Sequence, residues 1–386
     1  MLTPQSHLFQ LDPEYTYLNC AYMSPMLKSV EEAGMQGLLR KRTPHLIQPA
    51  DFFDEATELK ARFAQLIETD DPERICLVPA VSYGISLVAK NIDLQPGEEV
   101  LVLGEQFPSN YYPWERLARE KGGKITVVPA PTQGPEKRAA WNEAILAAIR
   151  PQTRVVAMGH VHWTDGTKFD LKAIRAKSRE VGALLIIDGT QSVGAMPFSI
   201  KELEVDALFC GAYKWLLGPY GSGIGYLGPA FDGGVPLEES WLNRKNSIDF
   251  SGLVDYESEY EPKAQRHEMG QRANFITVPM MKAAIEQILE WTPEAIQTYT
   301  KALTQQPLEA LREAGFQVDL SEDRPGHLFG IRLPGDLDPQ DIKQKLLAEK
   351  VVVSIRGTAV RVAPHVFATS SDMDKLVNLL LRVHVA

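Results

Sequence analysis

Short apolar runs alternate with amphipathic segments between about residues 75 and 230. Apolar runs of this length, bounded by turns, are typical of buried strands. The segments between them, such as 141–149 and 171–181, carry apolar residues at helical spacing, as βαβ units require. The pattern therefore predicts an α/β fold with a mostly parallel sheet. Its seven expected strands lie at 75–79, 100–103, 125–128, 155–159, 183–187, 207–210 and 223–227.

The pattern changes towards the C-terminus. Residues 232–274 are rich in Gly, Ser, Glu and Asn without a clear period, which indicates a crossing segment with loops. Helical and strand patterns then mix, and this mixture predicts a smaller α+β domain at the C-terminal end. The expected helices lie at 278–290, 295–314, 342–349 and 372–383, and the expected strands at 326–333, 351–354 and 360–362.

Length and patterning together suggest a domain organisation. A chain of 386 residues is long enough for two or three domain-sized units. We expect residues 1–16 to form an N-terminal arm that joins the small domain, residues 17–274 to form the large domain, and residues 275–386 to form the small C-terminal domain.

Composition excludes several classes of partner. The chain has 50 acidic and 40 basic residues without a dense basic block, which argues against a nucleic-acid or membrane partner. No stretch approaches the roughly 18 apolar residues of a spanning helix, and no signal peptide pattern opens the chain, so we expect a cytoplasmic protein. Cys20, Cys76 and Cys210 lack the spacing of a ligand set, and neither a disulfide scaffold nor a metal site is expected.

Two neighbouring predicted strands lead into polar side chains. Asp188 follows the run 183–187, and the run 207–210 leads through a short turn to Lys214. The carboxyl ends of parallel strands meet at one edge, where ligands collect, so one βαβ unit would bring both side chains together. Pyridoxal 5'-phosphate (PLP) needs a lysine amine for its Schiff base and an acid against its pyridine nitrogen. Asp188 and Lys214 fit these two roles.

Other interpretations of the same residues stay open. Taken singly, Asp188 fits a turn or helix cap, and Lys214 fits a pair with a surface carboxylate. Their apolar flanks favour the joint interpretation, because an unpaired buried charge costs several kcal/mol. The glycine-rich stretch 218–225 fits a loop with positive φ as well as a cofactor contact. A nucleotide-binding Rossmann domain is disfavoured, since no G-x-G-x-x-G follows the first strand.

A phosphate site and an aromatic wall are further candidates. Ser82 stands at a strand end that feeds a helix, whose free N–H groups and dipole attract phosphate, although a plain N-cap explains it equally well. Phe107 follows another strand and is placed to stack on a ring, or to be core. His160 and Trp163 follow the strand 155–159 and are candidates for the pocket lining, while a structural histidine remains the alternative for His160.

Two arginines occur in otherwise apolar strands near the C-terminus. Arg356 and Arg361 must meet an anion there, and the planar fork of arginine suits a substrate α-carboxylate. A buried structural ion pair is the alternative for each.

With these residues in place, the chain resembles the class V aminotransferase group of PLP enzymes over nearly its whole length. This group includes cysteine desulfurases, selenocysteine lyases, C–S lyases, kynureninases and isopenicillin N epimerase-like proteins. The Asp–x–x–Gln pattern at 188–191 with the later Lys214 is the specific signal. The resemblance also covers the segments 17–21, 81–85, 213–214 and 361–365, and it implies the PLP-dependent transferase fold type I.

The resemblance implies a role for each matching residue. Lys214 would form the Schiff base and then move the α-proton. The cofactor would also contact Val81, Ser82, Phe107, Asp188, Gln191 and Tyr213, and the substrate would contact Asn19, Ala21, Trp163, Arg356 and Arg361. Phe107 and Tyr213 match kynureninases more closely than desulfurases.

The resemblance also implies a homodimer with shared active sites. Gln271 and Arg272 stand where relatives carry Thr-Pro, and they are candidates for reaching the neighbouring cofactor.

The exact reaction is left open among several. The leading hypothesis is transamination or β-elimination of an amino acid. A kynureninase-like hydrolysis or an amino-acid epimerisation is the alternative. A persulfide-forming cysteine desulfurase is disfavoured, because the short segment between Arg356 and Arg361 contains no cysteine. A non-catalytic binding protein that kept the fold is the remaining class.

Overall fold

A seven-stranded sheet forms the centre of the large domain in the computed structural model, which describes residues 2–131, 137–335 and 337–385. The strand order is β2-β8-β7-β6-β5-β3-β4, and only β8 runs antiparallel to its neighbours. All seven predicted strands are confirmed to within one or two residues at their ends. They are β2 (Ile75–Val78), β3 (Glu99–Leu103), β4 (Lys124–Val128), β5 (Thr153–Gly159), β6 (Leu184–Asp188), β7 (Ala207–Gly211) and β8 (Gly223–Leu227).

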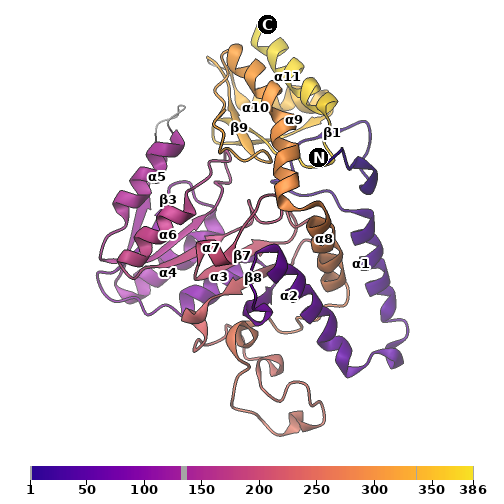
Figure 1. Ribbon diagram of the computed structural model, residues 1–386, viewed down its shortest axis with the longest axis vertical. Coiled ribbons are helices and arrows are strands. Elements are labelled where there is room, and N and C mark those ends of the chain that lie inside the picture. The colour runs from indigo at the N-terminus through magenta and orange to yellow at the C-terminus, as the bar shows by residue number, and fades with distance from the viewer. Residues whose placement is uncertain (1, 132–136, 336, 386) are drawn as a thin grey trace.

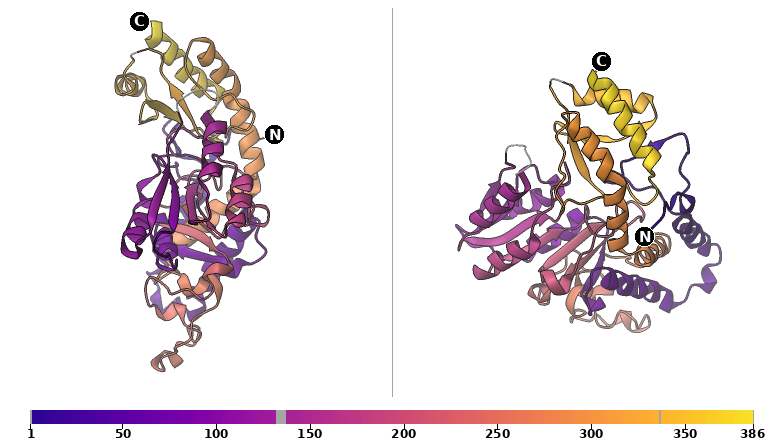
Figure 2. Two further views of the ribbon diagram at one scale, coloured as in Figure 1. Left: turned by 90° about the vertical axis from the view of Figure 1, so that its left-hand side faces the viewer. Right: turned by 45° about the horizontal axis from the view of Figure 1, so that its top comes forward.

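Helices cover both faces of this sheet (Figures 1 and 2). Side chains alternate along each strand, so Leu101 joins one apolar core while Val102 joins the other. The second core lies under α3 (Val81–Lys90) and α4 (Tyr112–Lys121). The first core includes side chains of α2 (Asp54–Leu66), α5 (Lys137–Ala148), α6 (Leu171–Glu180), α7 (Ile200–Leu203) and α8 (Thr277–Trp291). The pattern did not predict α2, α4 or the N-terminal α1 (Lys28–Arg40).

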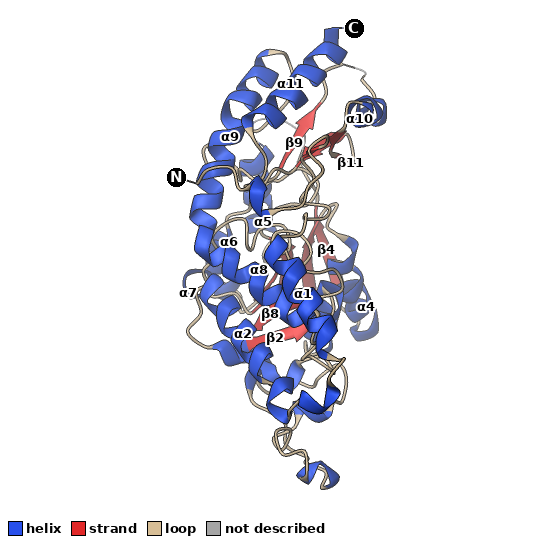
Figure 3. Cartoon of the chain, turned by 90° about the vertical axis from the view of Figure 1, so that its right-hand side faces the viewer, coloured by secondary structure: helices blue, strands red, loops and turns tan. Residues whose placement is uncertain are grey.

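The C-terminal part combines a second sheet with helices. The antiparallel order is β11-β12-β9, formed by β11 (Ser354–Arg356), β12 (Ala359–Val362) and β9 (Phe329–Arg332). The segment predicted as one strand at 351–354 is divided between β10 (Val351–Val352) and β11, on either side of Val353. The helices of this part are α9 (Pro293–Glu313), α10 (Pro339–Ala348) and α11 (Ser370–Val385), as Figure 3 shows.

The N-terminal segment lies against the C-terminal part. β1 (Thr16–Tyr17) pairs in parallel with β10, and the ring of Phe9 packs edge-on against Phe367 with centroids 5.2 Å apart. The helix α8 begins soon after residue 274 and packs against α1 and α2. Gly37 of α1 lies so close to Phe275 that a Cβ at position 37 would stand 1.9 Å from the carbonyl oxygen of Phe275. The domain boundaries drawn from the sequence stay a prediction.

The crossing segment 232–274 contains no strand or α-helix among its residues. Its ordered pieces are short 3₁₀ turns, including Trp241–Asn243, Gly252–Val254 and Lys263–His267. Part of it extends from the lower end of the molecule in Figure 1. This agrees with the loop-rich crossing expected from its composition.

Candidate active site

Asp188 and Lys214 line one cavity of about 270 Å³ at the carboxyl ends of β6 and β7. The two strands are parallel neighbours, and Asp188 is in register with Phe209. The hydroxyl of Thr190 accepts a hydrogen bond of 3.1 Å from the N–H of Gly211, which ties the turn after β6 to the tip of β7. The structure therefore brings the acid and the amine together at one edge of the sheet. We call residues 188–191 and 211–214 the strand-tip rim.

Asp188 is held by its own turn and has no cationic partner. Its Oδ1 accepts a hydrogen bond of 3.0 Å from the N–H of Thr190. Burial raises the pKa of this carboxyl, while the hydrogen bonds from Thr190 and the charge of Lys214 oppose the rise. Within the described ranges no ion pair involves Asp188, although a buried carboxylate gains from a cation beside it. The site therefore has a place for a protonated ring nitrogen.

Lys214 projects its amine into the cavity. The side chain is 8% exposed, and its Nζ lies 5.5 Å from the ring centroid of Phe107 and 5.3 Å from that of Tyr213. Burial lowers the pKa of Lys214 to about 8; Asp188 acts in the opposite direction, and Arg361 and Arg356 lower the pKa further. An amine with this pKa is partly neutral near pH 8, and a neutral amine is the nucleophilic form.

The N-terminus of α3 forms one end of the cavity. Val81 and Ser82 both line it, and the preceding residue, Ala80, has no side chain that caps the helix. The first N–H groups of a helix have no partner within the helix, and its dipole favours an anion there. Tyr220, Gly221 and Ser222 of the glycine-rich stretch line the same cavity. This end of the cavity fits a phosphate group.

Aromatic side chains form a wall on another side. Phe107 and Trp163 both line the cavity, with ring centroids 5.4 Å apart and planes at 82°. The indole N–H of Trp163 donates to the carbonyl of Glu105 at 2.7 Å. His162 also lines the cavity, whereas His160 faces a different cavity and packs edge-on against Phe198. The interpretation of His160 as a pocket residue is therefore wrong, because the chain turns it to the other side of the strand end.

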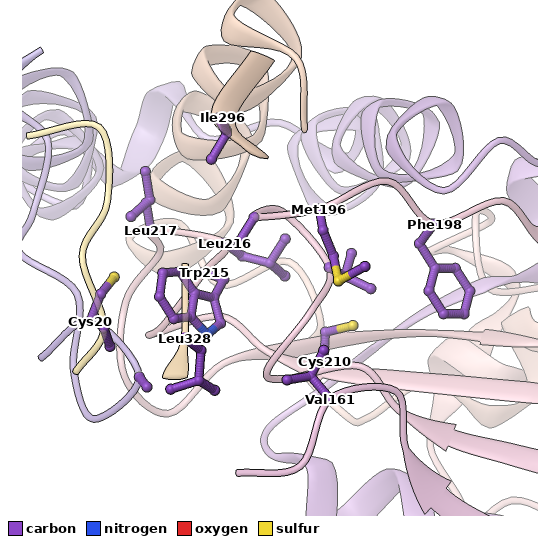
Figure 4. Close-up of a cluster of buried hydrophobic side chains, with 14 of the residues drawn as sticks. Cys20, Val161, Met196, Phe198, Cys210, Trp215, Leu216, Leu217, Ile296 and Leu328 are labelled. Carbon is purple, nitrogen blue, oxygen red and sulfur yellow. The ribbon is translucent and has the colours of Figure 1, made fainter. Parts of the chain in front are cut away.

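Gln191 is fixed at both ends of its amide. Its Nε2 donates to the carbonyl of Ala21 at 3.1 Å, and its Oε1 accepts from the indole N–H of Trp215 at 2.8 Å. Trp215 is fully buried in an apolar cluster, where Figure 4 shows it near Leu216, Leu217 and Leu328. Gln191 lines the cavity, and its Nε2 carries a second N–H besides the one that bonds to Ala21. Ala21 thus contacts Gln191 and is no part of the cavity wall.

Arg356 and Arg361 stand on the hairpin of β11 and β12, which we call the arginine hairpin (residues 354–362). Arg361 is 1% exposed, and its Nη1 donates to the carbonyl of Trp163 at 2.8 Å. Its Nε and Nη2 are buried without a hydrogen-bond partner. Arg356 lies over the ring of Trp163, 5.4 Å from the centroid. Asn19 is joined to the same hairpin by a hydrogen bond of 2.7 Å from Ser354.

Gln271 and Arg272 differ in where their side chains point. Arg272 is 4% exposed and forms an ion pair with the fully buried Glu268, which also pairs with Lys60 at 3.3 Å. Gln271 is exposed and adopts a positive φ of 55°. The side chain of Arg272 is therefore held inside the chain, whereas that of Gln271 is exposed.

Sequence reasoning assigned no role to several residues of this site, among them His162, Thr190 and Trp215. Thr190 stands inside the Asp–x–x–Gln pattern, and Trp215 follows Lys214 directly. These positions in the sequence could have indicated Thr190 and Trp215, because each is adjacent to a residue of the site. Each also carries a side-chain hydrogen-bonding group among largely apolar neighbours.

Comparison with known proteins gives one family and several relatives. A family model described as aminotransferase class-V matches residues 41–377. The uncharacterized aminotransferase YcbU of Bacillus subtilis (strain 168) is 28% identical, over 83% of this chain and 81% of YcbU. Isopenicillin N epimerase of Streptomyces clavuligerus is 24% identical, over 96% of this chain and 95% of the epimerase. The crystal structure of the cysteine desulfurase CsdA of Escherichia coli matches with a TM-score of 0.82 and 20% identity, over 98% of this chain and 96% of that chain.

Among the described residues, no helix has both the length and the apolar character needed to cross a bilayer.

Proposed function

Since the chain belongs to the class-V aminotransferase family of PLP-dependent enzymes, we propose that it transforms an amino acid at Lys214 by transamination or β-elimination. Its fold is the PLP-dependent fold type I, with a mostly parallel seven-stranded sheet. One observation carries the proposal: the amine of Lys214 and the carboxylate of Asp188 line one cavity, and neither is ion-paired within the described residues.

The side chains of the cavity fit PLP at each of its ends. Lys214 would hold the cofactor covalently, Asp188 would face its ring nitrogen, and the N-terminus of α3 at Val81 and Ser82 would hold its phosphate. The free N–H of Gln191 would meet its phenolic oxygen, and Phe107 would cover a face of the ring. When bound, PLP supplies an electron-accepting ring that stabilises negative charge at the substrate α-carbon.

The residues around Lys214 support proton transfer. With its pKa lowered to about 8, the free amine of Lys214 would be a base of moderate strength, able to move the α-proton of a substrate. Arg361 would bind the substrate carboxylate through its buried, unpartnered N–H groups and orient the α-carbon towards Lys214. Asp188 would remain ionised against the ring nitrogen, because the nearby positive charge lowers its pKa.

The cysteines argue against a persulfide mechanism. Cys20, whose Sγ lies 4.0 Å from the carbonyl oxygen of Lys214, is fully buried. Burial raises the pKa of its thiol, so the thiolate that would carry sulfur is disfavoured. Cys76 and Cys210 are buried as well. These observations support elimination or transamination over sulfur transfer.

Replacing Lys214 tests the proposal. Purified protein should absorb near the edge of the visible range, and Lys214→Ala should abolish that band together with turnover of every amino acid tried. Lys201→Ala, which removes an exposed lysine paired with Asp70, should leave both unchanged. Retained turnover in Lys214→Ala would refute the assignment.

Product analysis then separates the reactions. A keto acid with the cofactor left in its amine form indicates transamination, and ammonia with pyruvate indicates elimination. An epimerase remains the second candidate, because the match to isopenicillin N epimerase covers nearly the whole of both chains. Epimerisation would appear as loss of optical rotation without keto acid or ammonia.

A further inference from the structure

A second cavity of about 350 Å³ lies on the arginine hairpin side of the site. Arg356 connects it to the first cavity: its guanidinium lies over the ring of Trp163, which lines the first cavity, and its side chain lines the second. Asn19, Tyr22, Lys343 and Ser354 line the second cavity as well. The second cavity therefore lies beside the first, at the contact between Arg356 and Trp163.

The hairpin register places both arginines on one face. Ser354 is paired with Arg361 across the two strands, and Arg356 follows Ser354 by two residues on the same strand. Side chains two residues apart point to the same face of a strand, and so do directly paired residues. Arg356 and Arg361 are thus diagonal neighbours, and both charges act on Lys214.

The second cavity is positively charged. It is lined by Arg356 and Lys343, and none of its described lining residues is acidic. Arg356 Nη1 donates to the carbonyl of its neighbour Ile355 at 2.7 Å, whereas its Nε is buried without a partner. No ion pair involving Arg356 or Lys343 is formed within the described part of the chain. The buried Nε of Arg356 lacks an acceptor among the described residues, and a carboxylate would satisfy it.

An apolar path leads from Lys214 to Arg356. Lys214 Nζ lies 5.5 Å from the ring centroid of Phe107, which in turn lies 5.4 Å from the ring centroid of Trp163. On the other side of Trp163, Arg356 Cζ lies 5.4 Å from the centroid of the indole ring. Methylene groups would pack along these rings, and an anionic end would reach the guanidinium.

We propose that the substrate is an amino acid whose side chain crosses the Phe107–Trp163 wall and ends in a carboxylate, which Arg356 binds and Lys343 attracts. The inference rests on the proposed function, since it assumes reaction at Lys214. It assigns the two arginines different tasks. Arg361 takes the α-carboxylate, and Arg356 selects the side chain.

Carboxylate ligands that cannot react test this assignment. The holoenzyme is titrated by calorimetry with straight-chain dicarboxylates from malonate to adipate, each compared with the monocarboxylate of the same carbon number at constant ionic strength. We expect the best-fitting dicarboxylate to bind about tenfold more tightly or better, because a second charge-assisted hydrogen-bonded contact is gained. Arg356→Gln should abolish this preference, and Arg361→Gln should weaken the binding of both ligands.

Two lysines of α10 provide a matched control. Lys343→Gln should reduce the preference about two- to threefold, as expected for an exposed charge. Lys345→Gln removes the same charge from a lysine that pairs with Asp341 and lines neither cavity, so it should change nothing. Circular dichroism checks that each variant is folded.

Different outcomes would overturn the substrate class and the proposed function. Equal affinity of wild-type protein for the paired ligands, no binding of either, or a preference that survives Arg356→Gln would overturn the substrate class. The proposed function would instead be overturned if the wild-type protein lacked the absorption band of the cofactor, or if the Lys214→Ala variant kept this band.

Discussion

The strand-tip rim and the arginine hairpin both lie near Lys214 but are held in opposite ways. At the rim, hydrogen bonds within the protein fix the polar side chains: Thr190 N–H holds Asp188, and Trp215 holds Gln191. On the hairpin, Arg356 and Arg361 each donate to one carbonyl, while other buried N–H groups have no partner.

This difference separates a resident group from a transient one. Fixed side chains cost little to organise when a cofactor binds, which suits a group that stays in place. Each unpartnered buried donor costs about 1–3 kcal/mol, and a substrate that satisfies it recovers this free energy on binding. The rim is therefore suited to hold the cofactor, and the hairpin is suited to select the substrate.

The largest effect is expected from Asp188→Asn at the rim. Removing one partner of a buried charge pair costs about 3–5 kcal/mol, which corresponds to a loss of a hundredfold or more in affinity for PLP. Equilibrium titration of the apo-protein with PLP measures this. Asp206→Asn is the control, since Asp206 pairs with Arg175 at 2.8 Å away from the cavity and should leave affinity for PLP unchanged.

The same substitution should not destabilise the apo-protein. The pKa of Asp188 is raised in the folded chain, so its contribution to stability is present at low pH and is lost as the pH rises through the folded pKa. Asp188→Asn removes a buried carboxyl that has no ion-pair partner among the described residues. Thermal unfolding without PLP should therefore show an equal or higher melting temperature, and a clear decrease would contradict the account of Asp188.

An intermediate effect is expected on the pKa of Lys214, which the rim raises through Asp188 and the arginine hairpin lowers. Its pKa of about 8 predicts that the rate at which apo-protein takes up PLP rises with pH around a midpoint near 8, because only the neutral amine reacts. Asp188 raises this pKa and Arg361 lowers it. Asp188→Asn should therefore shift the midpoint down, and Arg361→Gln should shift it up.

Stopped-flow absorbance, normalised to the reaction of PLP with a free amine, gives the midpoint. Arg332→Gln is the control, because Arg332 pairs with Asp165 at 3.7 Å and does not act on Lys214. A midpoint near the ordinary value of 10.5 would show that Lys214 is not buried as described.

Local patterns made the sheet and the rim predictable from the sequence. Each strand of the large sheet is a short, mostly apolar run; Asp188 ends one of these strands, and Lys214 follows the end of another by three residues. The pattern did not predict α2, because the buried Lys60 interrupts its apolar face; this lysine forms an ion pair with Glu268, which is far away in the sequence. In α1, Gly34 and Gly37 take positions that apolar side chains would otherwise mark, since α8 packs closely there.

The direction of single side chains was less predictable. The side of a strand end on which His160 lies depends on where the strand stops, and the inward position of Arg272 depends on its pairing with Glu268. His160 packs against Phe198, and Glu268, the partner of Arg272, also pairs with Lys60, so both positions depend on residues far apart in the sequence. The second cavity depends likewise on how residues 19–22, α10 and residues 351–356 pack together, which no residue type reveals.

The smallest predicted effect tests the fixed amide of Gln191. Trp215→Phe keeps an aromatic ring in the buried cluster but removes the N–H that binds Gln191 Oε1 at 2.8 Å. A buried acceptor without its donor costs about 1–3 kcal/mol, and the amide becomes free to turn its oxygen to the cavity. We expect PLP to bind about three- to tenfold more weakly and its absorption band to titrate at a different pH. Trp291→Phe, which alters a buried indole on α8 with no described bond to Gln191, should change neither quantity. If both variants behave alike, Trp215 contributes only packing, and the rim is less rigidly fixed than its hydrogen bonds indicate.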